Sequence, residues 1–189
     1  MNVCQRLIRS EWGQALCSYE PASLTPWPLG SDNLVFLTDL GLPPHATDGG
    51  NLVIHFHAVE AFHFMRVNDI QGICIGETDV GVAILVDAHT GHVWAGDATG
   101  CTFMNASLKA LLCCMVMYHH EFIACPLNAE DEGESDDDDL PGTPATRARA
   151  DQLRARLNAI DPLALDASTQ GADVSMWAYV VEEVEYGVI

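Results

Sequence analysis

The chain has 189 residues, 49% of them apolar, a composition typical of a globular protein with a buried core rather than of a disordered chain. It carries 27 acidic against 8 basic residues, and this net charge of −19 excludes direct binding to nucleic-acid phosphates. No apolar run is long enough to span a bilayer, and the first residues lead into no signal-peptide core, so we expect a cytoplasmic protein.

The seven cysteines do not form a disulfide framework. Their number is odd and no Cys-x-x-Cys pair occurs, so we expect reduced thiols.

The first forty residues predict two helices. Residues 1–20 place apolar side chains along one side, although Gly13 weakens this helix. Prolines and a glycine between residues 21 and 32 indicate a loop. A short helix is then expected from Asn33 to Leu40, ended by Gly41 and Pro43.

A run of strands follows. Residues 52–58 and 61–67 alternate in polarity, and three further apolar runs lie at 73–75, 80–86 and 92–95. The turn at residues 88–91 contains a glycine, so the last two runs are predicted to form an antiparallel hairpin.

At about residue 104 the pattern changes to helical spacing, and an apolar stripe runs from Leu108 to Phe122. Asn105 or Ser107 can cap the start of this helix, predicted over 105–122. Two more helices are predicted at 144–160, opened by Thr143 and Pro144, and at about 174–186. Residues 1–189 are therefore expected to form one α+β domain, with a mainly antiparallel sheet of about five or six strands between residues 52 and 95 and helices at both chain ends.

Residues 129–142 are predicted to be a flexible acidic loop. Eight of the twelve residues from 129 to 140 are acidic, and like charges repel one another. A basic partner would be attracted to them, so we take as candidate partner-binding residues Glu130, Asp131, Glu132, Glu134, Asp136, Asp137, Asp138 and Asp139. The alternative is a linker that only raises solubility.

The sequence gives only weak evidence for a catalytic or metal site. His55, His57 and His63 could bind zinc from adjacent strands, but no recognised ligand spacing supports a metal site, and no cofactor is expected. Asp87, His89, Asp97 and Ser107 contain the residue types of a hydrolytic triad, yet turn and capping roles account for all of them. A metal- or cysteine-dependent enzyme using the three histidines or Cys113 is kept as an alternative.

Four pieces of the chain, in order, resemble the SUKH superfamily of bacterial toxin-immunity proteins. They are Phe-Leu-Thr-Asp-Leu-Gly-Leu-Pro at 36–43, the strands at 73–95 with their Asp-x-x-Thr-Gly-x-Val motif, Phe-Met-Asn-Ala-Ser-Leu at 103–108, and Asp161-Pro162 followed by Trp177. Together they cover most of residues 33–187.

The resemblance implies a non-enzymatic α+β protein that neutralises a cognate polymorphic toxin by binding it. Such toxins are often nucleases or nucleic-acid deaminases, which suggests a basic partner. The motif residues look structural, and no toxin-contacting residue can be transferred. A regulatory scaffold without a toxin partner, as in eukaryotic members of the superfamily, is the third possibility.

Overall fold

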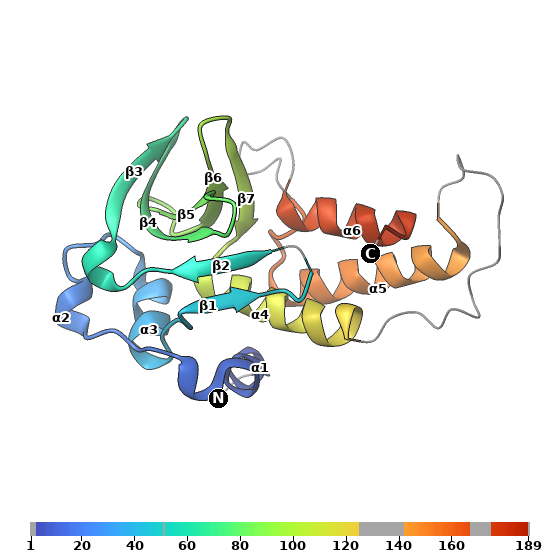
Figure 1. Ribbon diagram of the computed structural model, residues 1–189, viewed down its shortest axis with the longest axis horizontal. Helices are drawn as coiled ribbons and strands as arrows, with labels where there is room; N and C mark the ends of the chain where they lie inside the picture. Colours follow the sequence, from blue (N-terminus) through green and yellow to red (C-terminus); the bar gives the residue numbers. More distant parts are fainter. Residues whose placement is uncertain (1–2, 51, 125–141, 167–174, 189) are drawn as a thin grey trace.

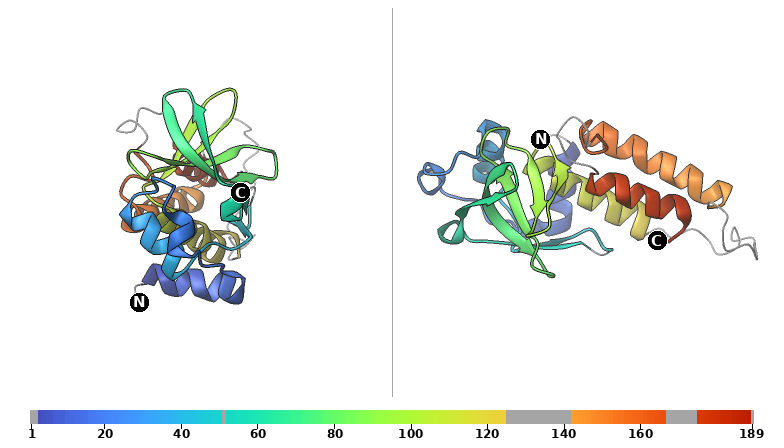
Figure 2. Two further views of the ribbon diagram at one scale, coloured as in Figure 1. Left: turned by 90° about the vertical axis from the view of Figure 1, so that its left-hand side faces the viewer. Right: turned by 90° about the horizontal axis from the view of Figure 1, so that it is seen from above.

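In the computed structural model, a curled antiparallel sheet has the helices on one of its faces (Figure 1; Figure 2, left). The structure describes residues 3–50, 52–124, 142–166 and 175–188. The α+β class and the antiparallel sheet predicted from the sequence are confirmed.

Three helices and a 3-10 turn precede the sheet: α1 (Val3–Trp12), η1 (Gly13–Ala15), α2 (Pro21–Leu24) and α3 (Ser31–Asp39). The helix predicted over residues 1–20 is therefore too long. It ends at Trp12 because Gly13 has a φ of +45°, a left-handed conformation that does not continue an α-helix. The predicted helix at 33–40 corresponds to α3 and begins two residues earlier.

The described residues form a sheet of seven strands: β1 (His45–Thr47), β2 (Val53–Phe56), β3 (His63–Val67), β4 (Ile70–Thr78), β5 (Ala83–Asp87), β6 (Val93–Gly96) and β7 (Cys101–Asn105). Their order is β1-β2-β4-β5-β6-β7, and β3 also pairs with β4. Strand β4 is long enough to pair with β3 through its first half and with β2 through its second half, while β5 occupies its other edge. The 3-10 turn η2 (Val59–Ala61) connects β2 to β3.

Strands β1 and β7 were not predicted, so the sheet is wider than the range from 52 to 95. β1 has only three residues, too few for a recognisable alternation. In β7 the last three residues are all buried, which also removes the alternation. The strand predicted from residue 80 begins at Ala83, because Val80 lies 81% exposed in the turn before it.

Helix α4 (Leu108–Tyr118) is surrounded by other elements. Nine of its eleven residues are buried, because α1, α3, α5, β1 and β7 all contact it, so the predicted single apolar stripe underestimated its burial. Ser107 caps it, with Oγ accepting from the amide of Ala110 at 3.2 Å, as predicted. It continues into the π-helical turn η3 (His119–Ile123).

Helices α5 (Pro144–Ile160) and α6 (Met176–Tyr186) pack side by side and extend beyond the sheet (Figure 1; Figure 2, right). The side chain of Thr143 caps α5, as predicted, and accepts from the amide of Thr146. Gly187, with a φ of 71°, ends α6 in the left-handed conformation common at helix C-termini. Trp177 of α6 and Leu111 of α4 are fully buried in the main core between helices and sheet.

Candidate partner-binding surface

The acidic residues predicted to bind a partner lie outside the described residues. This holds for Glu130, Asp131, Glu132, Glu134, Asp136, Asp137, Asp138 and Asp139, so their role stays a prediction. The basic residues of α5 are engaged within the chain: Arg154 binds Asp151 at 2.8 Å and also Glu185, and Arg156 binds Glu121 at 2.8 Å. Both arginines are therefore already paired with carboxylates of the same chain.

The residues that suggested a hydrolytic triad have structural roles. Asp87 accepts hydrogen bonds from the amides of His89 (3.0 Å) and Thr90 (2.6 Å) and from the Thr90 hydroxyl (2.8 Å), which closes the β5–β6 turn. Asp97 does the same in the β6–β7 turn, and the hydrogen bonds from Thr99 lower its pKa. Ser107 is used as the α4 cap. The interpretation as turn and capping residues is confirmed.

The three histidines do not lie on neighbouring strands. His55 on β2 faces Glu77, whereas His63 on β3 faces Cys74, so they lie along different halves of one edge of β4. The Nδ1 atom of His63 lies 3.1 Å from the carbonyl oxygen of Ala61. Within the described ranges, no group of three or more His, Cys, Asp or Glu side chains can hold a metal ion.

Cys113, the candidate nucleophile, is only 1% exposed inside α4. Its hydrogen bond with Cys4 and its burial raise its pKa, so it stays a neutral thiol. A neutral, buried thiol is a poor nucleophile, because the thiolate is the reactive form.

Asn105, Asp161 and Trp177 form one buried hydrogen-bond network. The Asn105 amide donates to Asp161 Oδ2 at 2.9 Å, and its oxygen accepts from the Trp177 indole at 2.9 Å. Asp161 also accepts from the backbone amides of Ala106 and Leu163 at 2.8 and 3.0 Å. Asn105 therefore ties β7 to α6 and to the end of α5, and does not cap α4 as the sequence suggested.

Asn33 forms a second internal junction. Its side-chain amide donates to the carbonyl oxygens of Leu29 and Gly91 at 3.0 and 2.7 Å, and its oxygen accepts from the amide of Leu108 at 3.0 Å. This joins α3, the β5–β6 turn and the start of α4. The backbone of Gly91 and of Leu108, one from each motif, thus meets at the buried side chain of Asn33.

A surface pocket of about 500 Å³ lies where the segment after η1 meets the ends of β2 and η2. A short antiparallel bridge between Cys17 and Leu42, with N–O distances of 2.9 and 3.2 Å, brings its two walls together. Gly41 is required there, because a Cβ atom would lie 2.0 Å from the carbonyl oxygen of Cys17. The lining is formed by Cys17, Ser18, Tyr19, Glu20, Ser23, Leu42, Pro43, Pro44, Phe56, His57, Ala58, Val59 and Glu60.

The polar residues that line the pocket are Ser18, Tyr19, Glu20, Ser23, His57 and Glu60. The Tyr19 hydroxyl donates to the carbonyl oxygen of His57 at 3.1 Å. Burial raises the pKa of Tyr19 to about 12, with smaller effects of Cys17 and Glu60, so the hydroxyl is neutral at physiological pH. Glu20 and Glu60 are both exposed, and the lining contains no lysine or arginine.

A family model described as "SUKH-4 immunity protein" matches residues 3–183, nearly the whole chain. The chain belongs to the SUKH-4 immunity protein family. Comparisons with curated proteins and with solved structures gave no match. The resemblance to the SUKH superfamily noted from the motifs is therefore confirmed.

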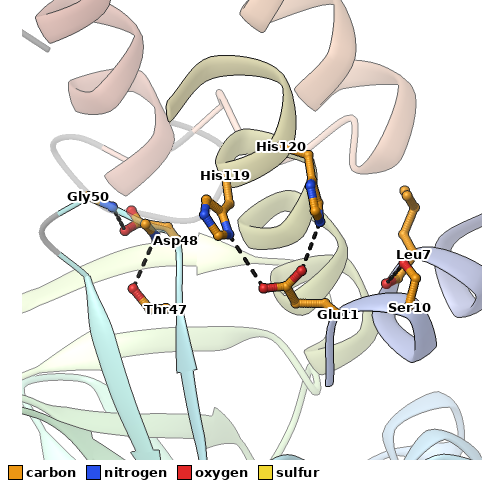
Figure 3. Close-up of polar contacts among 9 residues, drawn as sticks. Leu7, Ser10, Glu11, Thr47, Asp48, Gly50, His119 and His120 are labelled. Carbon is orange, nitrogen blue, oxygen red and sulfur yellow. Dashed lines mark hydrogen bonds and ion pairs between the residues drawn. The ribbon is translucent and has the colours of Figure 1, made fainter. Parts of the chain in front are cut away.

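In this SUKH-4 protein a carboxylate ties α1 to η3, the turn that continues α4 (Figure 3). Glu11 reaches His120 Nε2 at 2.8 Å and His119 Nδ1 at 3.4 Å, and the two imidazole rings stack on each other. Asp48 lies beside His119 and accepts from the amides of Gly50 and Leu52 at 2.8 and 3.2 Å. The histidine pair therefore anchors the N-terminal helix, a role that the sequence did not reveal.

No described helix of the SUKH-4 protein has the length and apolar character needed to cross a membrane. The pocket could not be anticipated from the sequence, because its walls come from three separate segments, around residues 17–23, 42–44 and 56–60. The only local signal is the pair Pro43-Pro44, which is rigid and lacks amide donors.

Proposed function

We propose that this SUKH-4 protein neutralises a cognate polymorphic toxin by binding it directly in a stoichiometric complex. The family match over residues 3–183 carries this proposal. On this view residues 1–189 act as one domain in the cytoplasm of the toxin-producing bacterium, where the toxin has to be held inactive.

Binding, rather than catalysis, is supported by how the reactive side chains are used. Asp87, Asp97 and Ser107 accept hydrogen bonds from nearby turns and helix ends, and Cys113 is buried and neutral. A catalytic site needs a nucleophile and a base within reach of each other and of a substrate. These residues offer no such arrangement.

The partner is proposed to be a basic toxin, a nuclease or a nucleic-acid deaminase. Enzymes that bind phosphates carry positive surfaces, and a protein with a net charge of −19 is attracted to such a surface. The acidic protein then blocks the toxin by occupying the surface that its substrate needs, with no cofactor and no direct contact of its own with nucleic acid.

The proposal predicts that a neighbouring gene encodes a large secreted protein with a toxic C-terminal domain, and the test uses that domain. Its activity is titrated with increasing amounts of the purified SUKH-4 protein, and the complex is weighed by light scattering. We expect inhibition that is complete at one equivalent and does not deepen with incubation time, and growth of cells that express both proteins.

Two results would contradict the proposal in different ways. Inactivation that progresses with time at substoichiometric amounts would indicate an enzyme acting on the toxin. A protein that neither binds the toxin nor protects cells would instead fit a regulatory scaffold.

A further inference from the structure

We propose that the pocket bounded by the segment 17–23, Leu42–Pro44 and η2 receives an arginine or lysine side chain of a basic protein partner. This inference rests on the proposed function, because it names the place where the toxin is held. Every wall residue it uses lies in the described part of the chain.

The walls suit the long aliphatic part of a basic side chain. Leu42, Pro43, Phe56 and Val59 line the pocket with apolar surface, and its volume of about 500 Å³ is ample for one long side chain. Arginine and lysine bury their methylene groups along apolar surface while the charged head stays at a polar site. The pocket therefore offers both parts of the side chain a matching environment.

The charge at the pocket favours a cation. Glu20 and Glu60 contribute two carboxylates to the lining, and no lysine or arginine is there to neutralise them. The Tyr19 hydroxyl already donates to the carbonyl oxygen of His57, so it is not a free donor for an anion. A guanidinium group also matches carboxylates through its fork of N–H donors.

A row of packed aromatic rings leads from the pocket toward β3 and reaches the surface at Phe64. Phe62 packs against Tyr19 and Trp27, with ring centroids 5.8 and 6.1 Å apart, and Trp27 contacts Phe64 at 5.4 Å. Phe64 is 56% exposed, and β4 is the only described strand that pairs with β3, so the outer edge of β3 is open. Aromatic residues and arginine are the types enriched in protein–protein interfaces.

The exposed ring of Phe64 beside the pocket favours a protein partner, because aromatic residues are enriched in protein–protein interfaces. The pocket is also separate from the α5 end of the molecule. In Figure 1, α2 and η2 lie at one end of the structure, whereas the N-terminus of α5 lies at the other. The pocket residues and the acidic residues 130–139 are different positions of the chain, so separate variants test the two contacts.

The first experiment titrates ¹⁵N-labelled protein with N-acetyl-arginine methylamide and with its neutral isostere, N-acetyl-citrulline methylamide. We expect the amide signals of Ser18, Ala58 and Val59 to shift. The arginine compound should bind about five-fold more tightly than the citrulline compound, because its charge can pair with Glu20 and Glu60 near the surface. The double variant Glu20→Gln/Glu60→Gln should lose this preference. The matched control, Asp69→Asn/Asp79→Asn, changes the net charge equally at exposed sites elsewhere and should keep it.

The second experiment measures the affinity of the same two double variants for the toxin. Glu20→Gln/Glu60→Gln should bind the toxin several-fold more weakly than the control double variant. Absent shifts, equal binding of the two compounds, or unchanged toxin affinity of Glu20→Gln/Glu60→Gln would each overturn the inference, and the immunity function would stand. Failure of the wild-type protein to bind the toxin would overturn the proposed function, which the compound titration does not test.

Discussion

The change Asp161→Ala tests the buried network that joins β7, α5 and α6. Asp161 is 3% exposed, and its carboxylate accepts from Asn105 Nδ2, the Ala106 amide and the Leu163 amide at 2.9, 2.8 and 3.0 Å. Alanine leaves the fully buried amide of Asn105 without this acceptor, whereas water can reach the half-buried backbone near Ala106 and Leu163 more easily.

The expected loss is about 3–5 kcal/mol in the free energy of unfolding. A hydrogen bond to a charged group is worth about 1.5–3 kcal/mol, and the three bonds do not add fully because rehydration compensates part of the loss. For a chain of this size the loss corresponds to a fall in melting temperature of about 6–20 °C. Asp161→Asn keeps one acceptor oxygen and should lose about 1–2 kcal/mol.

The assay is urea unfolding followed by circular dichroism, with thermal unfolding in parallel. Asp79→Ala is the control, because Asp79 is an exposed aspartate, and its removal should change the free energy by less than about 0.5 kcal/mol. If Asp161→Ala is no less stable than Asp79→Ala, the network does not hold these three elements together and the reasoning is wrong.

Three further predictions concern the core, a buried acid and the acidic segment. Leu111→Ala should destabilise the protein by about 2–5 kcal/mol in thermal unfolding, since Leu111 is fully buried, and a loss within error would contradict its place in the core. Burial raises the pKa of Asp48, so the folded state keeps a proton that the unfolded state releases near pH 4. The stability of the wild type should therefore fall relative to that of Asp48→Asn as the pH rises from about 4. A difference in unfolding free energy between the two proteins that does not change with pH would refute this. Changing the four aspartates at 136–139 to asparagine should slow association with the toxin and weaken its salt dependence, with less effect on dissociation; an unchanged association rate would make the segment a linker.

The local features of the fold were predictable because neighbouring residues determine them. Ser107 and Thr143 were identified as caps, and a cap needs only a hydroxyl placed before a helical run. The β5–β6 hairpin followed from the turn glycine, and α5 has the predicted bounds. Strand β1 is too short to show an alternation of polarity, and the last three residues of β7 are all buried. Periodicity therefore predicted neither strand.

By itself the sequence determined the α+β class, the starts of α4 and α5 set by their caps, the strong acidity and the family. Only the tertiary structure decided which distant residues meet. Asn105 contacts Asp161 across 56 residues and Trp177 across 72, and Glu11 meets His120 across 109. The pocket near η2 likewise gathers side chains from three segments. Such contacts depend on how helices and strands pack together, and packing is set by the whole buried surface, whereas caps and turns are set by a few adjacent residues.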